Sequence, residues 1–175
     1  MAKRILLVVG HSRNKQGASN PEGLSEYEFN KGIIMDIVKQ DEFRGVDIIP
    51  KLRVTSYYNL AYEINAINPD VVISLHCNAF NKETNGTEVL YSTGSKKGKE
   101  YAEIFQNNLV DWLRLPDRGI KPITRSDRGG KLLFGVKAPC ILLEPLFIDA
   151  YTSKELYDIQ DEIKEAIIES IWQIL

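Results

Sequence analysis

Residues 71–76 read VVISLH, a mostly apolar run followed directly by a histidine. A run of this kind, without regular polar alternation, predicts a strand that is covered on both faces of a sheet. Similar runs occupy residues 5–9, 46–49 and 140–143. Residues 86–92 alternate instead, and they predict a further strand nearer an edge of the sheet.

Helical patterns separate these runs. Residues 97–115 carry apolar side chains at helical spacing, and residues 25–39 and 57–68 predict two more helices. A further helix is predicted at the end of the chain, where Thr152 and Glu155 offer a capping box. Its apolar positions recur at helical spacing and are Leu156, Ile159, Ile163, Ile167, Ile171 and Ile174. Strands that alternate with helices predict an α/β sandwich with a largely parallel sheet, in which ligands gather at the carboxyl ends of the strands.

The composition limits the classes of protein to consider. The chain has 175 residues and a formal net charge of −2, which predicts one domain over residues 1–175 and gives no reason to expect nucleic acid as a partner. The first apolar run is too short for a signal peptide or a membrane span, so we expect synthesis in the cytoplasm and no membrane insertion. Cys77 and Cys140 lie in apolar runs and are expected to be buried thiols.

The only two histidines share a position relative to the predicted strands. His11 follows the run 5–9 and its Gly10, and His76 follows the run 71–75. Either histidine alone is more simply explained as a satisfied residue near the core, but in a parallel sheet both imidazoles emerge at one edge. Glu144 directly follows the run 140–143. A carboxylate next to a buried strand is rare unless it is paired or functional. The simpler alternative is a side chain that turns out to solvent at the end of the strand.

Two acids compete for an inward position at the start of helix 25–39. Glu26 lies on the stripe that continues through Asn30 and Ile33, whereas Glu28 lies on the solvent side. Ser25 and Glu28 also match the capping-box pattern. We therefore expect Glu26 to point toward the sheet and Glu28 to cap the helix.

Two histidines and one carboxylate at a common cleft make the open three-ligand set typical of catalytic zinc. A second carboxylate would then act as the base, and the combination is typical of amide hydrolysis. Other nucleophiles fit less well. Cys77 directly follows His76, and neighbours on a strand project to opposite faces, while residues 10–14 lack the second glycine of a serine nucleophile elbow.

Six blocks of sequence, in order, resemble the zinc-dependent N-acetylmuramoyl-L-alanine amidases of the amidase_3 family, most closely the catalytic domains of clostridial-type phage endolysins. The blocks are VGHS (9–12), GA (17–18), EYEFN (26–30), ISLHCNA (73–79), GTEV (86–89) and APCILLEPLFI (138–148). Together they extend over nearly the whole chain. The resemblance implies a three-layer sandwich with a mixed, mostly parallel sheet of about six strands flanked by helices.

The resemblance also implies roles for individual residues. His11, Glu26 and His76 match the zinc ligands, and Glu144 matches the catalytic acid and base. Asn78 and Asn30 match positions that support the site in relatives. Many relatives carry two glycines where this chain has Ser12 and Arg13, an alanine at Cys77 and a small residue at Pro145, which leaves the substrate preference open.

The implied substrate is peptidoglycan, cleaved between N-acetylmuramic acid and the first L-alanine of the stem peptide. Arg125 and Arg128, in the polar stretch 124–130, are candidates for pairing with stem-peptide carboxylates, although two solvated loop arginines would look the same. We expect a monomer that acts on the wall after release from the cell, with no cell-wall-binding domain in residues 1–175.

Two alternatives remain open at this point. A zinc carboxypeptidase or endopeptidase acting on the stem peptide would use the same four residues, because their chemistry serves any amide. A non-catalytic module that binds cell-wall fragments would need the cleft, but it would not need Glu144.

Overall fold

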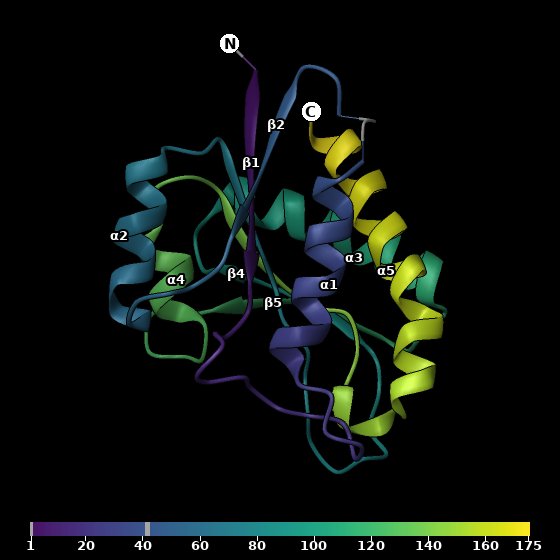
Figure 1. Ribbon diagram of the computed structural model, residues 1–175. Coiled ribbons are helices and arrows are strands. Elements are labelled where there is room, and N and C mark those ends of the chain that lie inside the picture. Colours follow the sequence, from purple (N-terminus) through teal and green to yellow (C-terminus); the bar gives the residue numbers. More distant parts are fainter. Residues whose placement is uncertain (1, 41–42) are drawn as a thin grey trace.

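The computed structural model describes residues 2–40 and 43–175. One sheet of six strands runs through the molecule, with helices on both of its faces (Figure 1). The strands are β1 (Lys3–Val9), β2 (Val46–Lys51), β3 (Val71–Leu75), β4 (Thr87–Ser92), β5 (Asp117–Ile123) and β6 (Cys140–Glu144). The helices are α1 (Glu26–Val38), α2 (Tyr57–Ile67), α3 (Lys96–Leu113), α4 (Gly130–Gly135), α5 (Ser153–Ile174) and the 3-10 turn η1 (Ile148–Ala150).

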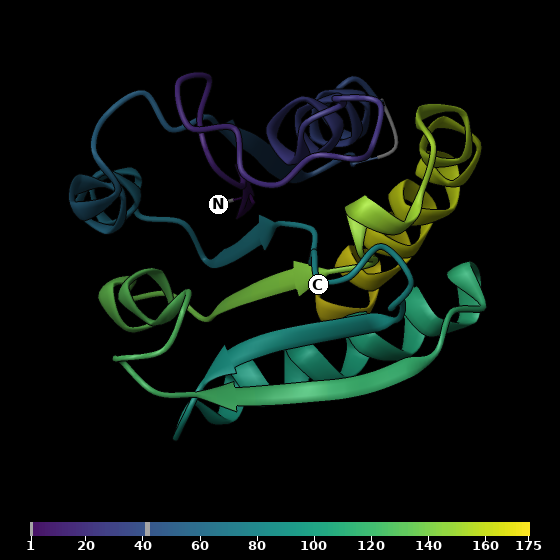
Figure 2. The same cartoon turned by 90° about the horizontal axis from the view of Figure 1, so that it is seen from below.

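The sheet is mixed and mostly parallel, as the resemblance implies. Its strand order is β2-β1-β3-β6-β4-β5, and β4 and β6 form the antiparallel pair. In Figure 2 the arrowheads of β4 and β5 point opposite to those of β3 and β6. Because of this reversal, the first residues of β4 lie beside the last residues of β6.

Two apolar cores explain why the central strands lack polar alternation. Ile5, Leu7 and Val9 of β1 face the core that packs under α1, α3 and α5. Leu6 and Val8, the intervening residues, face the core under α2 and α4. Both faces of β1 are therefore buried, which confirms the strand type predicted from the sequence.

The ends of the helices follow the predicted caps, with one correction. Thr152 and Glu155 form the expected capping box of α5. At α1 the Ser25 hydroxyl accepts from the Glu28 N–H, but the Glu28 carboxylate lies 3.6 Å from the Lys31 ammonium nitrogen instead of completing a box. Glu28 therefore contributes its backbone to the cap, and its side chain belongs to the exposed helix surface.

A strand, a helix and the 3-10 turn η1 are absent from the prediction. Strand β5 contains Gly119 and Pro122, which mask a strand pattern, and it lies at an edge of the sheet, where proline is tolerated. Helix α4 has six residues, too few for a periodic apolar stripe. Among the described residues, no helix has the length and apolar character needed to cross a membrane.

Candidate metal centre and catalytic cleft

The carboxyl ends of β1 and β3 bring the two histidines together. Gly10, which follows β1, donates its N–H to the Leu75 carbonyl at 2.9 Å, and this bond brings the end of β1 against the end of β3. His76 follows β3 and donates its own N–H to the Leu143 carbonyl of β6 at 2.9 Å. The two imidazole centroids lie 5.2 Å apart, as the parallel pairing of these strands predicts.

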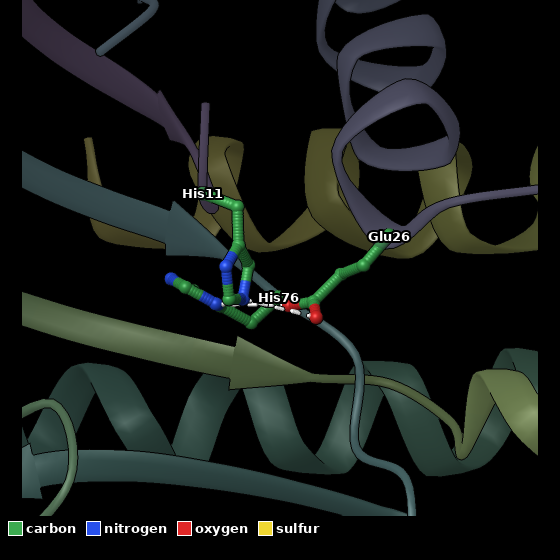
Figure 3. A group of neighbouring side chains, drawn as sticks. All are labelled: His11, Glu26 and His76. Atoms are coloured by element: carbon green, nitrogen blue, oxygen red, sulfur yellow. Dashed lines mark hydrogen bonds and ion pairs between the residues drawn. The ribbon is translucent and has the colours of Figure 1, made fainter. Parts of the chain in front are cut away.

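Glu26, the first residue of α1, completes a group of three converging side chains (Figure 3). Its Oε2 lies 3.0 Å from His11 Nε2, and its Oε1 lies 3.0 Å from His76 Nδ1. One ligand atom from each of the three residues lies within 4.8 Å of the others. Glu26 is fully buried whereas Glu28 is exposed, which confirms the inward position that the helix periodicity predicts for Glu26.

Hydrogen bonds from the backbone hold the Glu26 carboxylate in place. Its Oε1 accepts the Cys77 N–H at 3.0 Å, and its Oε2 accepts the Ala18 N–H at 3.3 Å. Burial opposes ionisation of Glu26, but the interactions with His11 and His76 outweigh burial, so its pKa falls well below the usual range. The site therefore presents a fixed negative charge between two imidazoles.

The residues present fit a divalent metal ion. His11 Nε2 is buried and has no aligned hydrogen-bond partner among the described residues, although it lies close to Glu26. Gly17 closes over the site so tightly that a Cβ there would lie 2.5 Å from Glu26 Oε2 and 2.7 Å from His11 Cδ2. Two imidazole nitrogens and a carboxylate oxygen are ligand types that zinc and similar divalent ions accept.

Glu144 is the last residue of β6 and lines the same cleft as His11 and His76. It is 5% exposed, and it forms no ion pair within the described residues. Burial raises its pKa to about 7, and the negative charge of Glu88 contributes to the increase while Arg128 opposes it. A carboxyl group that exchanges its proton near neutral pH is suited to acid–base catalysis.

Glu88 is a residue of the site that the sequence argument did not single out. It lies opposite Glu144 in the antiparallel register of β4 and β6. Its Oε1 accepts from Asn78 Nδ2 at 2.8 Å, and its Oε2 accepts from Arg118 Nε at 2.9 Å. The one sequence signal for Glu88 is its place in the GTEV block that resembles the family. The strand pattern alone does not show that Glu88 faces Glu144.

The remaining predicted residues take two different positions. Asn78 lines the cleft, as do Arg125 and Arg128. Asn30 is fully buried behind the site, where its Oδ1 accepts from Cys77 Sγ at 3.5 Å. Burial raises the pKa of the Cys77 thiol well above its usual range, which agrees with an inert buried cysteine.

The cleft has a volume of about 1730 Å³ and extends well beyond the three converging side chains. Leu90, Ile123 and Leu142 give it apolar lining from β4, β5 and β6. The segments before α2 and before α4 form its walls. This size suits an extended substrate rather than a single small group.

Comparisons with known proteins support this description. The family model described as N-acetylmuramoyl-L-alanine amidase matches residues 5–173. No curated protein sequence matches the chain.

Solved structures share the fold over almost the whole chain. An N-acetylmuramoyl-L-alanine amidase from Clostridium difficile 630 has 22% sequence identity and a TM-score of 0.83, covering 98% of this chain and 96% of that one. The amidase AmiC2 of Nostoc punctiforme has 21% identity and a TM-score of 0.84, with coverage of 98% and 96%. The catalytic domain of the CD27L endolysin, which targets Clostridia difficile, has 24% identity and a TM-score of 0.79, with coverage of 98% and 97%.

The family match extends across both histidines, Glu26 and Glu144, and thus across the whole cleft. The chain belongs to the N-acetylmuramoyl-L-alanine amidase family, whose enzymes hydrolyse the amide bond between N-acetylmuramic acid and the first L-alanine of the peptidoglycan stem peptide.

Proposed function

We propose that this amidase is zinc-dependent, with His11, Glu26 and His76 as the ligands and Glu144 as the group that carries the proton. The observation that supports the proposal most strongly is the convergence of the three ligand atoms within 4.8 Å of one another. Three protein ligands leave a further coordination position open, which is typical of catalytic zinc. When bound there, zinc would supply Lewis acidity toward the amide carbonyl and the attacking water.

Glu144 performs the proton transfers in this proposal. As a carboxylate it accepts a proton from the water that attacks the carbonyl carbon of the lactyl group. As the carbon–nitrogen bond breaks, it delivers that proton to the nitrogen of the departing L-alanine. In the metal-free protein, burial and the charge of Glu88 raise the pKa of Glu144 to about 7. A divalent cation bound nearby would lower this pKa and favour the carboxylate that accepts the first proton.

Asn78 supports this arrangement from the cleft wall. Its side-chain amide donates to Glu88 at 2.8 Å, and Glu88 in turn faces Glu144. We propose that Asn78 contacts substrate through its remaining hydrogen-bonding capacity, and that Arg125 and Arg128 contact the stem peptide. Asn30 supports the site indirectly, through Cys77 and the backbone bond of Cys77 to Glu26.

Two variants separate the ligand role from the proton-transfer role. His76→Ala is expected to lose bound zinc, and Glu144→Gln is expected to retain zinc but to lose turnover by about 100-fold or more. Metal analysis of the purified proteins and release of soluble muropeptides measure the two effects. Full zinc content in His76→Ala would contradict the ligand set, and rapid turnover in Glu144→Gln would contradict its assignment as the base.

We also propose that the enzyme degrades cell walls as a monomer, in the manner of a phage endolysin. The similarity of its fold to the catalytic domain of the CD27L endolysin supports this role. The test is the addition of purified protein to a suspension of bacterial walls, with the molecular mass in solution measured by light scattering. Clearing of the suspension by a monomer is the expected result, and activity found only in a larger assembly would contradict it.

A further inference from the structure

Positive charge is concentrated along the cleft. The chain as a whole has a net charge of −2, yet three carboxylates and eight cationic side chains line the cleft. The carboxylates are Glu88, Asp127 and Glu144, and the cations are Arg13, Lys15, Arg53, Arg118, Lys121, Arg125, Arg128 and Lys131. A cleft lined by charge of one sign attracts substrates of the opposite sign.

Most of these cations have no acidic partner among the residues that the structure describes. Within residues 2–40 and 43–175, Arg118 is the single member of the set that forms an ion pair, with Glu88 at 2.9 Å. The Asp127 carboxylate accepts the Thr124 N–H at 2.6 Å and the Thr124 hydroxyl at 2.8 Å, so it is occupied within its own loop. The other seven side chains therefore form no ion pair within the described part of the chain, and cations outnumber carboxylates along the cleft.

Aromatic rings position three of the cations without neutralising them. Arg53 Cζ lies 5.7 Å from the centre of the Tyr57 ring, and Arg125 Cζ lies 5.4 Å from that of Phe134. Lys131 Nζ lies 4.0 Å from the centre of the Tyr58 ring. A cation held against a ring face keeps N–H donors available for an anion, because the ring takes up none of them as a conventional acceptor.

The three stacked cations come from two segments that face one cleft. Arg53 lies in the connection from β2 to α2, and Tyr57 is the first residue of α2. Residues 124–129 connect β5 to α4, and Lys131 lies in the first turn of α4. Helices α2 and α4 cover the same face of the sheet, side by side in Figure 1. The cations therefore line the cleft that also contains His11, His76 and Glu144.

We propose that Arg53, Arg125, Arg128 and Lys131 form a carboxylate subsite that selects stem peptides with a free carboxyl group over otherwise identical stem peptides in which that group is a carboxamide. The proposal rests on the proposed function, because it assumes that the peptide beyond the cleaved amide lies in this cleft. Replacing the carboxylate by a carboxamide removes a full negative charge and leaves the shape of the substrate almost unchanged. Charge-assisted hydrogen bonds are stronger than neutral ones, so the effect is directly measurable.

The test compares two muropeptides that differ only in this carboxylate or carboxamide. The expected result is a kcat/KM about tenfold higher for the carboxylate, a preference that shrinks at a salt concentration of about 0.5 M. Arg125→Ala and Lys131→Met should reduce the preference, while Lys99→Met should leave it unchanged. Lys99 is the matched control because it is exposed on α3, which covers the other face of the sheet.

A binding measurement gives a readout that does not depend on turnover. Calorimetry with the Glu144→Gln protein should show tighter binding of the carboxylate muropeptide, and Arg125→Ala should remove the difference. Equal kcat/KM and equal affinity for both muropeptides would overturn the subsite but leave the amidase intact. Failure to cleave purified peptidoglycan at all would instead contradict the proposed function.

Inorganic phosphate and glycerol phosphate serve as competing anions in the same measurement. Phosphate groups of wall polymers share the chemistry that the cations recognise. Weaker binding of both phosphates than of the carboxylate muropeptide is the expected result. Tighter binding of either phosphate would assign the cations to wall-polymer phosphates and overturn the proposal.

Discussion

Glu88 and Glu144 occupy directly opposite positions on adjacent antiparallel strands, β4 and β6. Asn78 and Arg118 hydrogen bond to the Glu88 carboxylate at 2.8 and 2.9 Å and stabilise its negative charge. Burial raises the pKa of Glu144 to about 7, and the nearby charge of Glu88 contributes to this rise. The pKa of Glu144, the proposed catalytic group, therefore depends in part on the strand register that places Glu88 opposite it.

Glu88→Gln is expected to lower the pKa of Glu144, because the substitution removes a like charge and keeps an oxygen that accepts from Asn78. The measurement is a pH titration of the Glu144 carboxyl group by carbon-13 NMR in zinc-free protein. Glu100→Gln, on the exposed surface of α3, is the matched control and should leave the titration unchanged. An unchanged midpoint in Glu88→Gln would show that Glu88 does not act on Glu144.

Glu144→Gln is expected to stabilise the zinc-free protein at alkaline pH. The folded-state pKa of about 7 lies above the reference value of 4.5, so between these values the folded protein binds more protons than the unfolded chain. Unfolding free energy therefore falls as pH rises through this window, whereas the glutamine variant lacks this loss. The relative stability of the variant should increase by about 3 kcal/mol from about pH 4 to about pH 8.

Urea unfolding of both proteins with a chelator present measures this difference. Comparing the two proteins at each pH cancels the contributions of the other titrating groups, provided that those groups behave alike in both. A stability difference between the two proteins that stays constant across the pH range would contradict the assignment of a raised pKa to Glu144.

Glu26→Gln is expected to weaken metal binding by about tenfold or more, because it keeps a hydrogen-bond acceptor for the Cys77 N–H but removes the charge. Glu28→Gln should leave metal binding unchanged, because the Glu28 side chain is exposed and pairs with Lys31. Competition for zinc with a chelating dye measures both affinities. Loss of zinc affinity in Glu28→Gln alone would show that Glu28, and not Glu26, is the ligand.

Gly17→Ala is expected to disturb the metal centre itself, since its Cβ would lie 2.5 Å from Glu26 Oε2. Gly23→Ala is the matched control, because Gly23 has a similarly positive φ of 90° but a Cβ added there would meet no atom of the described residues within 4 Å. Both substitutions should cost about 1 kcal/mol of stability through backbone strain. Zinc affinity should fall in Gly17→Ala only, and an equal fall in both variants would contradict a local clash.

Much of this site could be predicted because local patterns determine it. His11 and His76 each follow an apolar run, and parallel pairing of β1 and β3 places both at one edge. Helix periodicity separates Glu26 from Glu28, since the two positions differ by about 200° around a helix axis. The assignment of Glu26 as ligand and Glu144 as base needed the family resemblance, because the sequence pattern places both carboxylates near the same two histidines and does not distinguish their roles.

The parts that could not be predicted depend on long-range geometry. Gly119 and Pro122 interrupt the sequence pattern of strand β5, so the strand is not predicted. Without this strand, the sequence gives no reason to place Arg118 beside Glu88. The pairing of Glu88 with Glu144 depends on the antiparallel register of β4 and β6, which no pattern within either strand specifies. The stacking of Lys131 on Tyr58 likewise joins two separate segments.

The proposed activity is zinc-dependent cleavage of the amide between N-acetylmuramic acid and L-alanine. The most direct measurement is digestion of purified peptidoglycan with and without a zinc chelator, followed by identification of the new amino termini by mass spectrometry. The expected result is new amino-terminal L-alanine, which is lost on chelation and returns when zinc is added. A different new terminus, or cleavage that a chelator leaves unchanged, would contradict it.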